Sequence, residues 1–309
     1  MSRFSPEKKQ SLFRGIYEAD SENPRLRLYE LAEYLGTVRN TAAEYRKMAY
    51  ENQILFPPQL RLKMFSDVKE YACAFKADDA FRVFEQLKSD PRVCYQVLCK
   101  GRLDLLVITS FPFSVKEVAA SELIFRGARS DYIVPYVSDI DGKTALNLMM
   151  EKVEESPSPS KWEVTYPRRE IFWTNHEWDL FQLLRHNASR PYTELASRIP
   201  LHYDTFSSSL ERIFANTILF VPYYPKGYES YMSWILIFKS NYEQLLIDML
   251  SCQPCTTVLY KVADWFVADV KVETNLAGHY LRLLYGLEDT GIIDMFDVAC
   301  AALYWQPDP

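Results

Sequence analysis

Apolar residues recur at helical spacing through the first fifty residues of the chain. A stripe that includes Leu12 and Ile16 predicts a helix over residues 5–20, and the same spacing predicts helices over 26–35 and 37–49. The stretch that follows is rich in β-formers and is broken by two prolines. Three helices followed by a strand pair predict a winged helix-turn-helix over residues 1–66.

After this unit the pattern changes from helical spacing to an alternation of strands and helices. The order strand-helix-strand-strand-helix-strand is that of a ferredoxin-like βαββαβ domain, which we expect over residues 67–142. Its two helices would cover one face of the sheet and leave the other face in need of a partner. The predicted elements are strand 68–77, helix 78–90, strands 93–100 and 103–111, helix 114–129 and strand 131–137.

Both units return in the second half of the chain. Residues 189–222 repeat residues 25–58 without a gap, so that Glu30-Leu31-Ala32 reappears as Glu194-Leu195-Ala196. The fold class is therefore α+β, with a tandem repeat of the two units. The expected domains are a winged helix-turn-helix over 1–66, a ferredoxin-like domain over 67–142, a Ser/Pro-containing linker over 143–169, a second winged helix-turn-helix over 170–228 and a second ferredoxin-like domain over 229–309.

Composition adds limits to this architecture. The chain has 309 residues, 48% apolar and 25% charged, and a net charge of −6, which is typical of a globular protein. It has no apolar run long enough to span a membrane and no signal-peptide core at its N-terminus, so we expect a cytoplasmic protein without a membrane partner. The two repeated winged units are the least acidic parts of the chain, and this charge distribution favours contact with the negatively charged phosphates of a nucleic acid.

A short turn between two predicted strands connects the architecture to a known family. Gly101-Arg102-Leu103-Asp104 forms a Gly-x-x-Asp turn, and together with the winged unit it resembles the leucine-responsive/AsnC-type (feast/famine) transcriptional regulators. The resemblance implies that two ferredoxin-like sheets pack face to face, here as a pseudo-dimer within one chain. It also implies that a small effector, an amino acid or similar, binds near Gly101, Arg102 and Asp104. The second half lacks this turn and reads Val262-Ala263-Asp264-Trp265.

The third helix of the first winged unit carries the residues expected to read DNA. A helix fits the major groove, where Arg pairs with guanine and Asn with adenine, while Lys and wing residues contact phosphates. The second copy of this helix has lost the equivalents of Arg39 and Lys47. We therefore predict a sequence-specific transcriptional regulator that binds double-stranded DNA mainly through its first half. The predicted contact residues are Arg39, Asn40, Thr41, Glu44, Arg46, Lys47, Arg61 and Lys63.

Two other functions stay open from the sequence. One is a protein-interaction scaffold whose winged helices do not bind DNA. The other is an enzyme, because some proteins that resemble these regulators are siroheme decarboxylases, which use paired modules and histidines to handle a tetrapyrrole. All the histidines, His176, His186, His202 and His279, lie in the second half, and none has the spacing of a ligand pair.

The sequence contains no nucleophile–base pair, phosphate-binding loop or dinucleotide fingerprint. Cys252 and Cys255 have the spacing of a redox or zinc pair, but they close a predicted helix instead of opening one, and no second pair completes a zinc site. We therefore expect no enzymatic activity, no catalytic residues, no metal and no cofactor. Further self-association into a homo-oligomer stays open.

Overall fold

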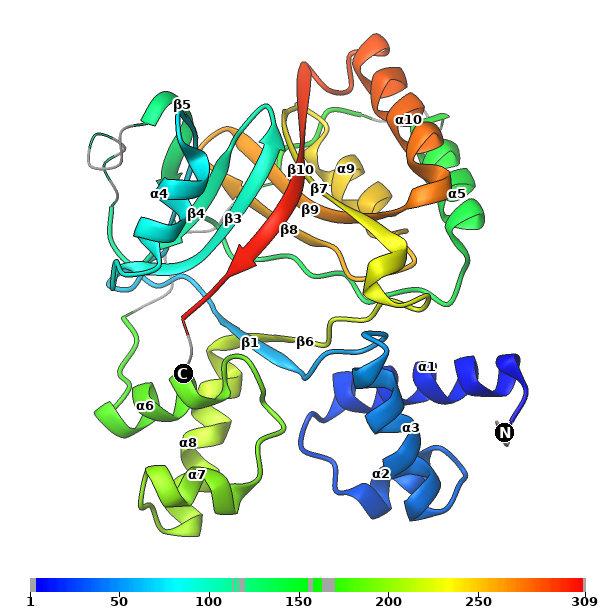
Figure 1. Ribbon diagram of the computed structural model, residues 1–309, viewed down its shortest axis with the longest axis vertical. Helices are drawn as coiled ribbons and strands as arrows, with labels where there is room; N and C mark the ends of the chain where they lie inside the picture. Colours follow the sequence, from blue (N-terminus) through cyan, green and yellow to red (C-terminus); the bar gives the residue numbers. More distant parts are fainter. Residues whose placement is uncertain are drawn as a thin grey trace.

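The computed structural model describes residues 4–112, 114, 116, 120–154, 158–162 and 170–307. Two helical lobes lie side by side beneath a large β-sheet, and a thin two-stranded ribbon runs between the two layers (Figure 1). No described helix is long and apolar enough to cross a membrane.

The two lobes are the helical parts of the two repeated units. The first lobe comprises α1 (Pro6–Glu22), α2 (Leu28–Tyr34) and α3 (Arg39–Glu51). The Ser5 hydroxyl accepts a hydrogen bond of 3.3 Å from the Lys8 backbone and so begins α1, while Gly36 has a φ of 58° after the end of α2. The second lobe repeats this arrangement with α6 (Asn175–Leu184), α7 (Tyr192–Arg198) and α8 (Tyr203–Ala215). The three-helix prediction is thus confirmed in both halves.

The wings differ from the expected strand pairs. Each half supplies one strand, β1 (Gln59–Leu62) or β6 (Thr217–Phe220), and these two strands pair with each other in an antiparallel ribbon. The strands also exchange apolar side chains between the lobes. Leu60 and Leu62 of the first half are buried in the core of the second lobe, whereas Val221 and Tyr223 of the second half are buried in the core of the first lobe. Neither lobe is therefore complete without the other half of the chain.

The upper layer is one eight-stranded antiparallel sheet with the order β5-β2-β4-β3-β10-β7-β9-β8. Each half contributes four strands in the ferredoxin-like order, and the pairing of β3 with β10 joins the halves. The first-half elements are β2 (Tyr71–Ala77), α4 (Ala80–Leu87), β3 (Val93–Gly101), β4 (Leu105–Thr109) and β5 (Ala120–Ala128). The second-half elements are η2 (Tyr228–Ser230), β7 (Tyr231–Lys239), α9 (Glu243–Leu250), β8 (Val258–Val262), β9 (Trp265–Glu273), η3 (Thr274–Leu276), α10 (Ala277–Asp289) and β10 (Met295–Trp305).

The inner faces of the two four-stranded halves share one apolar core. Val97 and Leu106 of the first half belong to the same buried cluster as Ile235 and Val267 of the second. The edge strands β5 and β8 also approach each other, through an isolated bridge between Arg129 and Val262 and another between Ile133 and Leu259. The ferredoxin-like tandem repeat packed as a pseudo-dimer is therefore confirmed.

The two ferredoxin-like units are not equally complete. The second has both of its helices, and the linker helix α5 (Gly142–Glu154) packs beside α9 and α10 (Figure 1). In the first unit the expected helix over 114–129 is wrong for its larger part, because residues 120–128 form β5 and pair along β2. Residues 113, 115 and 117–119 lie outside the described part of the chain. The expected strand over 131–137 is also wrong: it makes one bridge and then leads Val137 into the core of the first lobe.

Candidate functional site

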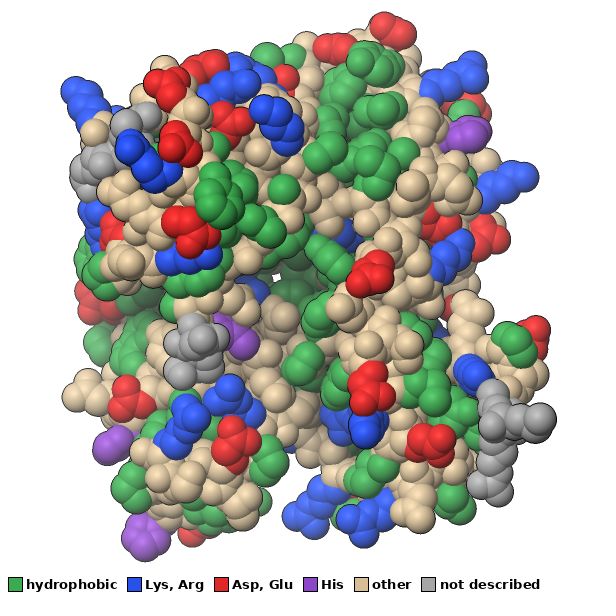
Figure 2. Space-filling view, viewed as in Figure 1, with side chains coloured by type: hydrophobic (Ala, Val, Ile, Leu, Met, Phe, Trp, Pro, Cys, Tyr) green, Lys and Arg blue, Asp and Glu red, His purple; other side chains and the backbone are tan. Residues whose placement is uncertain are grey.

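A cavity of about 560 Å³ lies where the sheet meets the ribbon. Figure 2 shows a hollow in the middle of the molecule at this level, with apolar walls and basic side chains nearby. Its size falls in the range of roughly 300–1,000 Å³ that is usual for small-molecule and cofactor sites. The described residues that line it are Phe56, Gln59, Arg61, Glu70, Cys94, Tyr95, Leu106, Ile108, Tyr132, Arg185, Phe220, Pro222, Tyr224, Tyr228, Ile235, Thr256, Val258, Tyr260, Val267, Asp269, Lys271, Tyr304, Trp305 and Gln306.

The framework of the cavity follows the internal repeat. Phe56 and Phe220 are equivalent positions of the repeated stretch, and both line the cavity from the ribbon. On the sheet, Leu106 comes five residues after Gly101, and Val267 comes five residues after Val262, the equivalent turn position of the second half. Both residues line the cavity as well. The cavity therefore lies between the halves, with matching apolar residues from each of them.

The charged residues of the cavity, unlike the apolar ones, have no charged equivalents in the other half. One cluster of them is basic. Arg61 of β1 points toward the carbonyl oxygen of Arg185, to which its Nη1 donates at 3.3 Å, while its Nη2 donates to Gln59 Oε1 at 2.6 Å. Burial and then the charge of the Arg185 guanidinium lower the pKa of Arg61, so the two cations are close enough to repel each other. The position in the first half that corresponds to Arg185 is Ser21.

Only one carboxylate faces these arginines among the described lining residues, and it has another partner. Glu70 accepts a hydrogen bond of 2.9 Å from Nε of Arg129, whose side chain is fully buried. Burial raises the pKa of Glu70, but the guanidinium groups of Arg129, Arg185 and Arg61 outweigh it, so the pKa lies below its ordinary value. Glu70 has three guanidinium groups around it, and Asp131 adds a second carboxylate near Arg129, so the cations still outnumber the carboxylates at this end of the cavity.

A second charged cluster lies on β9 and β10. Asp269 and Lys271 are two residues apart on β9, so their side chains share the inner face of the sheet. Lys271 Nζ donates to Asp269 Oδ1 and, at 3.2 Å, to the hydroxyl oxygen of Tyr304. The positions at the same spacing in the first half are Ile108 and Ser110, so this lysine and aspartate occur in one half alone.

Several buried polar atoms next to the basic cluster have no hydrogen-bond partner in the described part of the chain. They include both ring nitrogens of His186 and Nε of Arg185. Burial and then the charges of Arg185, Arg61 and Arg190 lower the pKa of His186 to about 3, so this imidazole is neutral at pH 7. Buried polar groups without partners are uncommon, and they mark this part of the second lobe as a place where a ligand or water would be bound.

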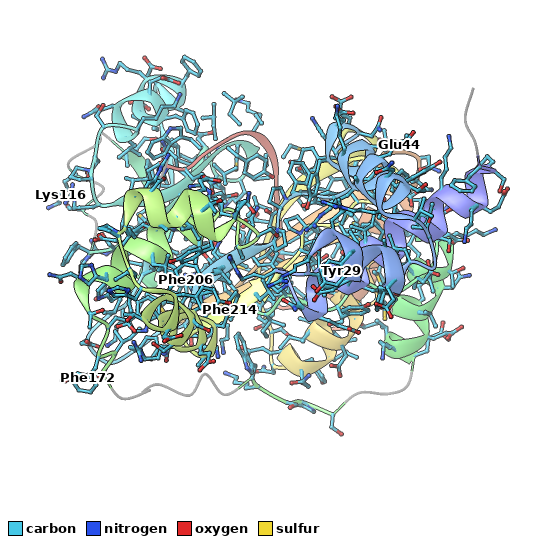
Figure 3. All side chains as sticks on the ribbon, turned by 90° about the horizontal axis from the view of Figure 1, so that it is seen from below. Tyr29, Glu44, Lys116, Phe172, Phe206 and Phe214 are labelled. Atoms are coloured by element: carbon cyan, nitrogen blue, oxygen red, sulfur yellow. The ribbon has the colours of Figure 1, made fainter. Side chains whose placement is uncertain are left out.

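The predicted DNA-contact residues of α3 divide into two groups. Arg39, Asn40, Glu44 and Lys47 are exposed. In Figure 3 Glu44 lies on the side of the first lobe that is remote from Phe206 and Phe214 of the second lobe.

Two other residues predicted on this helix point inward. Thr41 is buried, and Arg46 donates at 2.8 Å to Asp20 of α1, whose side chain is fully buried. These two side chains hold the lobe together.

The predicted wing residues take part in the joint between the halves. Arg61 lines the cavity, as described above. Lys63 Nζ donates at 2.9 Å to the carbonyl oxygen of Ala215 at the end of α8. Because the wings form the ribbon, both basic side chains contact the other half of the chain.

The predicted effector turn packs against β10. Gly101 has a φ of 139°, and a Cβ added there would lie 2.6 Å from the carbonyl oxygen of Val298. Arg102 forms ion pairs with Glu122 at 2.7 Å and with Asp297 at 3.3 Å, and the Ala77 backbone donates to Asp104 at 3.3 Å. Gly101, Arg102 and Asp104 are not among the residues that line the cavity.

Neither a family model nor a curated protein matches this sequence. Solved structures do match the fold. The crystal structure of the siroheme decarboxylase NirDL aligns with a TM-score of 0.55 over 96% of this chain and 93% of its own length, at 10% identity. The complex of NirDL with an iron-uroporphyrin III analogue aligns with a TM-score of 0.51 over 96% of this chain and 92% of its own, at 11% identity.

This chain shares the fold of siroheme decarboxylase NirDL. At such low identity the similarity shows the architecture of winged-helix and ferredoxin-like units, and it shows no particular residue. The expectation that the chain is not an enzyme is nevertheless contradicted, because both solved structures that match over nearly the whole chain are those of an enzyme.

Sequence reasoning missed Arg185, Lys271 and Tyr304 because they come from three distant segments that meet only in the folded chain. In the stretch WFVADVKVE the charged residues Asp269, Lys271 and Glu273 alternate with apolar residues, which predicts a strand whose charged face is exposed to solvent. In the structure Lys271 on that face is buried, so the local pattern did not indicate the site. No group of three or more His, Cys, Asp or Glu side chains in the described residues is arranged to hold a metal ion.

Proposed function

We propose that this chain is a decarboxylase that binds a carboxylate-bearing tetrapyrrole in the cavity between its sheet and its ribbon. The observation that carries the proposal is the excess of positive charge around the half-buried Arg61 and Arg185. These cations are paired mainly with neutral oxygens, and Nε of Arg185 has no hydrogen-bond partner among the described residues, so a carboxylate ligand would neutralise the charge and accept that hydrogen bond. Arginine is suited to this role because its planar guanidinium pairs with a carboxylate through two parallel bonds.

The walls of the cavity support a planar ligand. Tyr95, Tyr132 and Tyr260 line it from the sheet side, while Phe56 and Phe220 line it from the ribbon. Aromatic side chains on both sides give the flat apolar contact that a conjugated ring system requires. A ligand with a flat ring and carboxylates at its rim would match both the walls and the basic cluster.

The structural similarity supports the same ligand class. NirDL is a siroheme decarboxylase, and its structure has been solved with an iron-uroporphyrin III analogue. In this chain no histidine is among the described residues of the cavity lining. The proposal therefore assigns recognition to the carboxylates and the ring face of the substrate.

The test is a titration of the purified chain with iron uroporphyrin III, followed by the Soret absorbance. We expect a saturable spectral change, and we expect Arg61→Gln with Arg185→Gln to weaken binding by about 30-fold or more, since removing one partner of a buried charge pair costs roughly 2–5 kcal/mol. An iron porphyrin without carboxylates should bind the wild type weakly. Arg198→Gln, an exposed arginine of α7, is the control. Absence of a spectral change in the wild type would refute the proposal.

DNA binding is a second candidate function. It is favoured by the exposed Arg39, Asn40, Glu44 and Lys47 on α3. A gel-shift titration of Arg39→Ala with Lys47→Ala tests it, because loss of two basic contacts should abolish duplex binding, and the wild type should bind more weakly as the salt concentration rises. Arg198→Ala provides the matched control. If the double variant and the wild type bind equally, or if neither binds, this candidate is rejected.

A further inference from the structure

We propose that Tyr304 is the catalytic proton donor of the cavity, and that Lys271, held in place by Asp269, is the residue that positions its hydroxyl. The inference rests on the proposed decarboxylase function and assigns its chemistry to one end of the cavity. The arginine cluster would anchor the substrate, and the Lys271 cluster would carry out the reaction.

The geometry of the cluster supports a defined position for the Tyr304 hydroxyl. Lys271 Nζ donates to it at 3.2 Å and also lies 5.4 Å from the centre of the Tyr304 ring. The Lys271 side chain is 5% exposed, and Asp269 fixes its ammonium group from the same strand. The Tyr304 ring also packs against that of Tyr95, with 6.2 Å between their centres. Tyr304 lines the cavity and is 36% exposed, so its hydroxyl is held by Lys271 and solvent can still reach the residue.

The protonation states suit the assigned roles. Burial, followed by the charge of Asp269, raises the pKa of Tyr304, so the phenol carries its proton at neutral pH. Burial lowers the pKa of Lys271, but the carboxylate of Asp269 outweighs it and keeps the amine charged. The charged Lys271 ammonium group lies beside the Tyr304 oxygen, where it stabilises the phenolate that Tyr304 becomes after it gives up its proton.

The step balances without an oxidant or a reductant. In the substrate, the bond between the methylene carbon of an acetate substituent and its carboxylate breaks, and carbon dioxide leaves. The electron pair stays on the methylene carbon, where the conjugated ring delocalises it. The Tyr304 hydroxyl then transfers its proton to this carbon and forms a methyl group, and the phenolate is protonated again from solvent. Proton transfer by a positioned side chain contributes typically about 100- to 10,000-fold to a rate.

The Tyr304 hydroxyl also interacts with the hydroxyls of Tyr228 and Ser233, and the neighbouring aromatic side chains have further partners. The Tyr228 hydroxyl is 3.1 Å from Ser233 Oγ, and the ring of Tyr132 lies under the guanidinium of Arg129 at 3.8 Å. Among the described residues that line the cavity, Tyr304 is the tyrosine whose hydroxyl accepts a hydrogen bond from a lysine. The first half has Ile108 and Ser110 where the second has Asp269 and Lys271, so the reaction would take place at one end of the cavity and on one carboxylate at a time.

The experiment compares Tyr304→Phe with the wild type in binding and in turnover of iron uroporphyrin III, with products resolved by mass spectrometry. We expect Tyr304→Phe to bind within about 3-fold of the wild type, because it keeps the ring, and to lose roughly 100- to 10,000-fold in kcat. In heavy water the wild type should place deuterium in the new methyl group. Tyr285→Phe, an exposed tyrosine of α10, is the matched control and should keep full activity.

Lys271 provides the second arm of the experiment. Lys271→Met should lower kcat with little change in KM, and it should move the alkaline limb of the pH–rate profile, because the phenolate loses its neighbouring charge. Lys271→Arg should restore part of kcat. A merely structural lysine would not move the pH profile.

The two proposals fail in different ways. If the wild type neither binds nor decarboxylates the probe, the proposed function is wrong. If the wild type turns over and Tyr304→Phe is equally fast, the function stands and the assignment of Tyr304 is wrong.

Discussion

The two halves of the chain have kept the same framework and have changed their charges. Equivalent apolar positions, such as Leu106 with Val267 and Phe56 with Phe220, line the cavity from both sides. The charged lining residues do not come in such pairs: Ile108 stands where the second half has Asp269. In a symmetric dimer of identical chains each charge would occur twice by necessity. A fused repeat escapes this constraint, so one cavity can have a basic end and a separate lysine–tyrosine end.

The halves also differ in how they join the layers. The first half has the buried Glu70–Arg129 pair. When β2 and β7, the first strands of the two ferredoxin-like units, are aligned, Ser233 stands at the position of Glu70. The first half keeps a glycine turn against β10, whereas the second has Val262 and Ala263 in the equivalent turn. Three substitutions would sharpen or break this comparison, and they follow from the largest expected effect to the smallest.

Glu70→Gln should have the largest effect on stability. It removes the carboxylate that is ion-paired with the fully buried Arg129, and breaking a buried pair in this way costs about 3–5 kcal/mol. Urea unfolding at pH 7 measures it. Glu122→Gln is the control, because its pair with Arg102 is partly exposed and such pairs contribute about 0–1 kcal/mol. Equal losses in the two variants would show that the buried pair does not distinguish the first half.

Gly101→Ala should come next. A φ of 139° is strained for a residue with a Cβ, and the added methyl would lie 2.6 Å from the Val298 carbonyl oxygen. We expect a loss toward the upper end of the roughly 1–3 kcal/mol that strained backbone positions cost. Ala263→Gly in the second half is the matched change: Ala263 has a φ of 52°, so glycine should cause no loss there. The comparison breaks if both variants unfold at the urea concentration of the wild type.

His186→Gln should have the smallest effect, and it should depend on pH. The folded chain holds the pKa of His186 at about 3, below the ordinary value of 6.5, so the unfolded chain binds an extra proton between these values. The contribution of the neutral His186 to the free energy of unfolding is therefore fully present above pH 6.5 and is lost as the pH falls toward 3. At pH 5 we expect a loss of at most about 2 kcal/mol, because solvent screens this partly buried imidazole.

Urea unfolding at pH 7.5 and at pH 5 measures this difference, and the variant should lack it. The equivalent position in the first half is the exposed Glu22, so Glu22→Gln serves as the control. A wild type whose stability changes no more than that of His186→Gln between the two pH values would contradict the assignment.

Much of the fold could be predicted because its signals are local. The helical stripe around Leu12 and Ile16, the cap at Ser5 and the glycine after α2 all lie within a few residues of the structures they produce. Because the sequence repeats, the same elements could then be predicted for the second half of the chain. The strand β5 could not be read in the same way. Residues 120–128 have apolar residues that suit either a helix or a strand, and pairing along β2 decides between them.

The candidate site was less accessible to sequence reasoning because its residues meet through long-range packing. Arg61 was predicted to contact phosphates on a free wing. The wing is instead a strand of the ribbon, and this places the guanidinium beside Arg185 from the other half. Tyr304 lies near the end of the chain, and no local motif links it to Lys271. The alternation of charged and apolar residues around Lys271 predicts an exposed lysine, and only the packing of the folded chain buries it and determines what it contacts.

The exchanged ribbon also bears on how the protein is made. Val221 and Tyr223 belong to the core of the first lobe, so this lobe lacks part of its interior until more than two thirds of the chain has been synthesised. The second lobe has no such delay, because Leu60 and Leu62 have already left the ribosome when its helices emerge. Contacts between such distant segments form slowly, since a long loop must close first. The lobe that is translated first is therefore the one that is completed last, and its apolar surface stays exposed for most of synthesis.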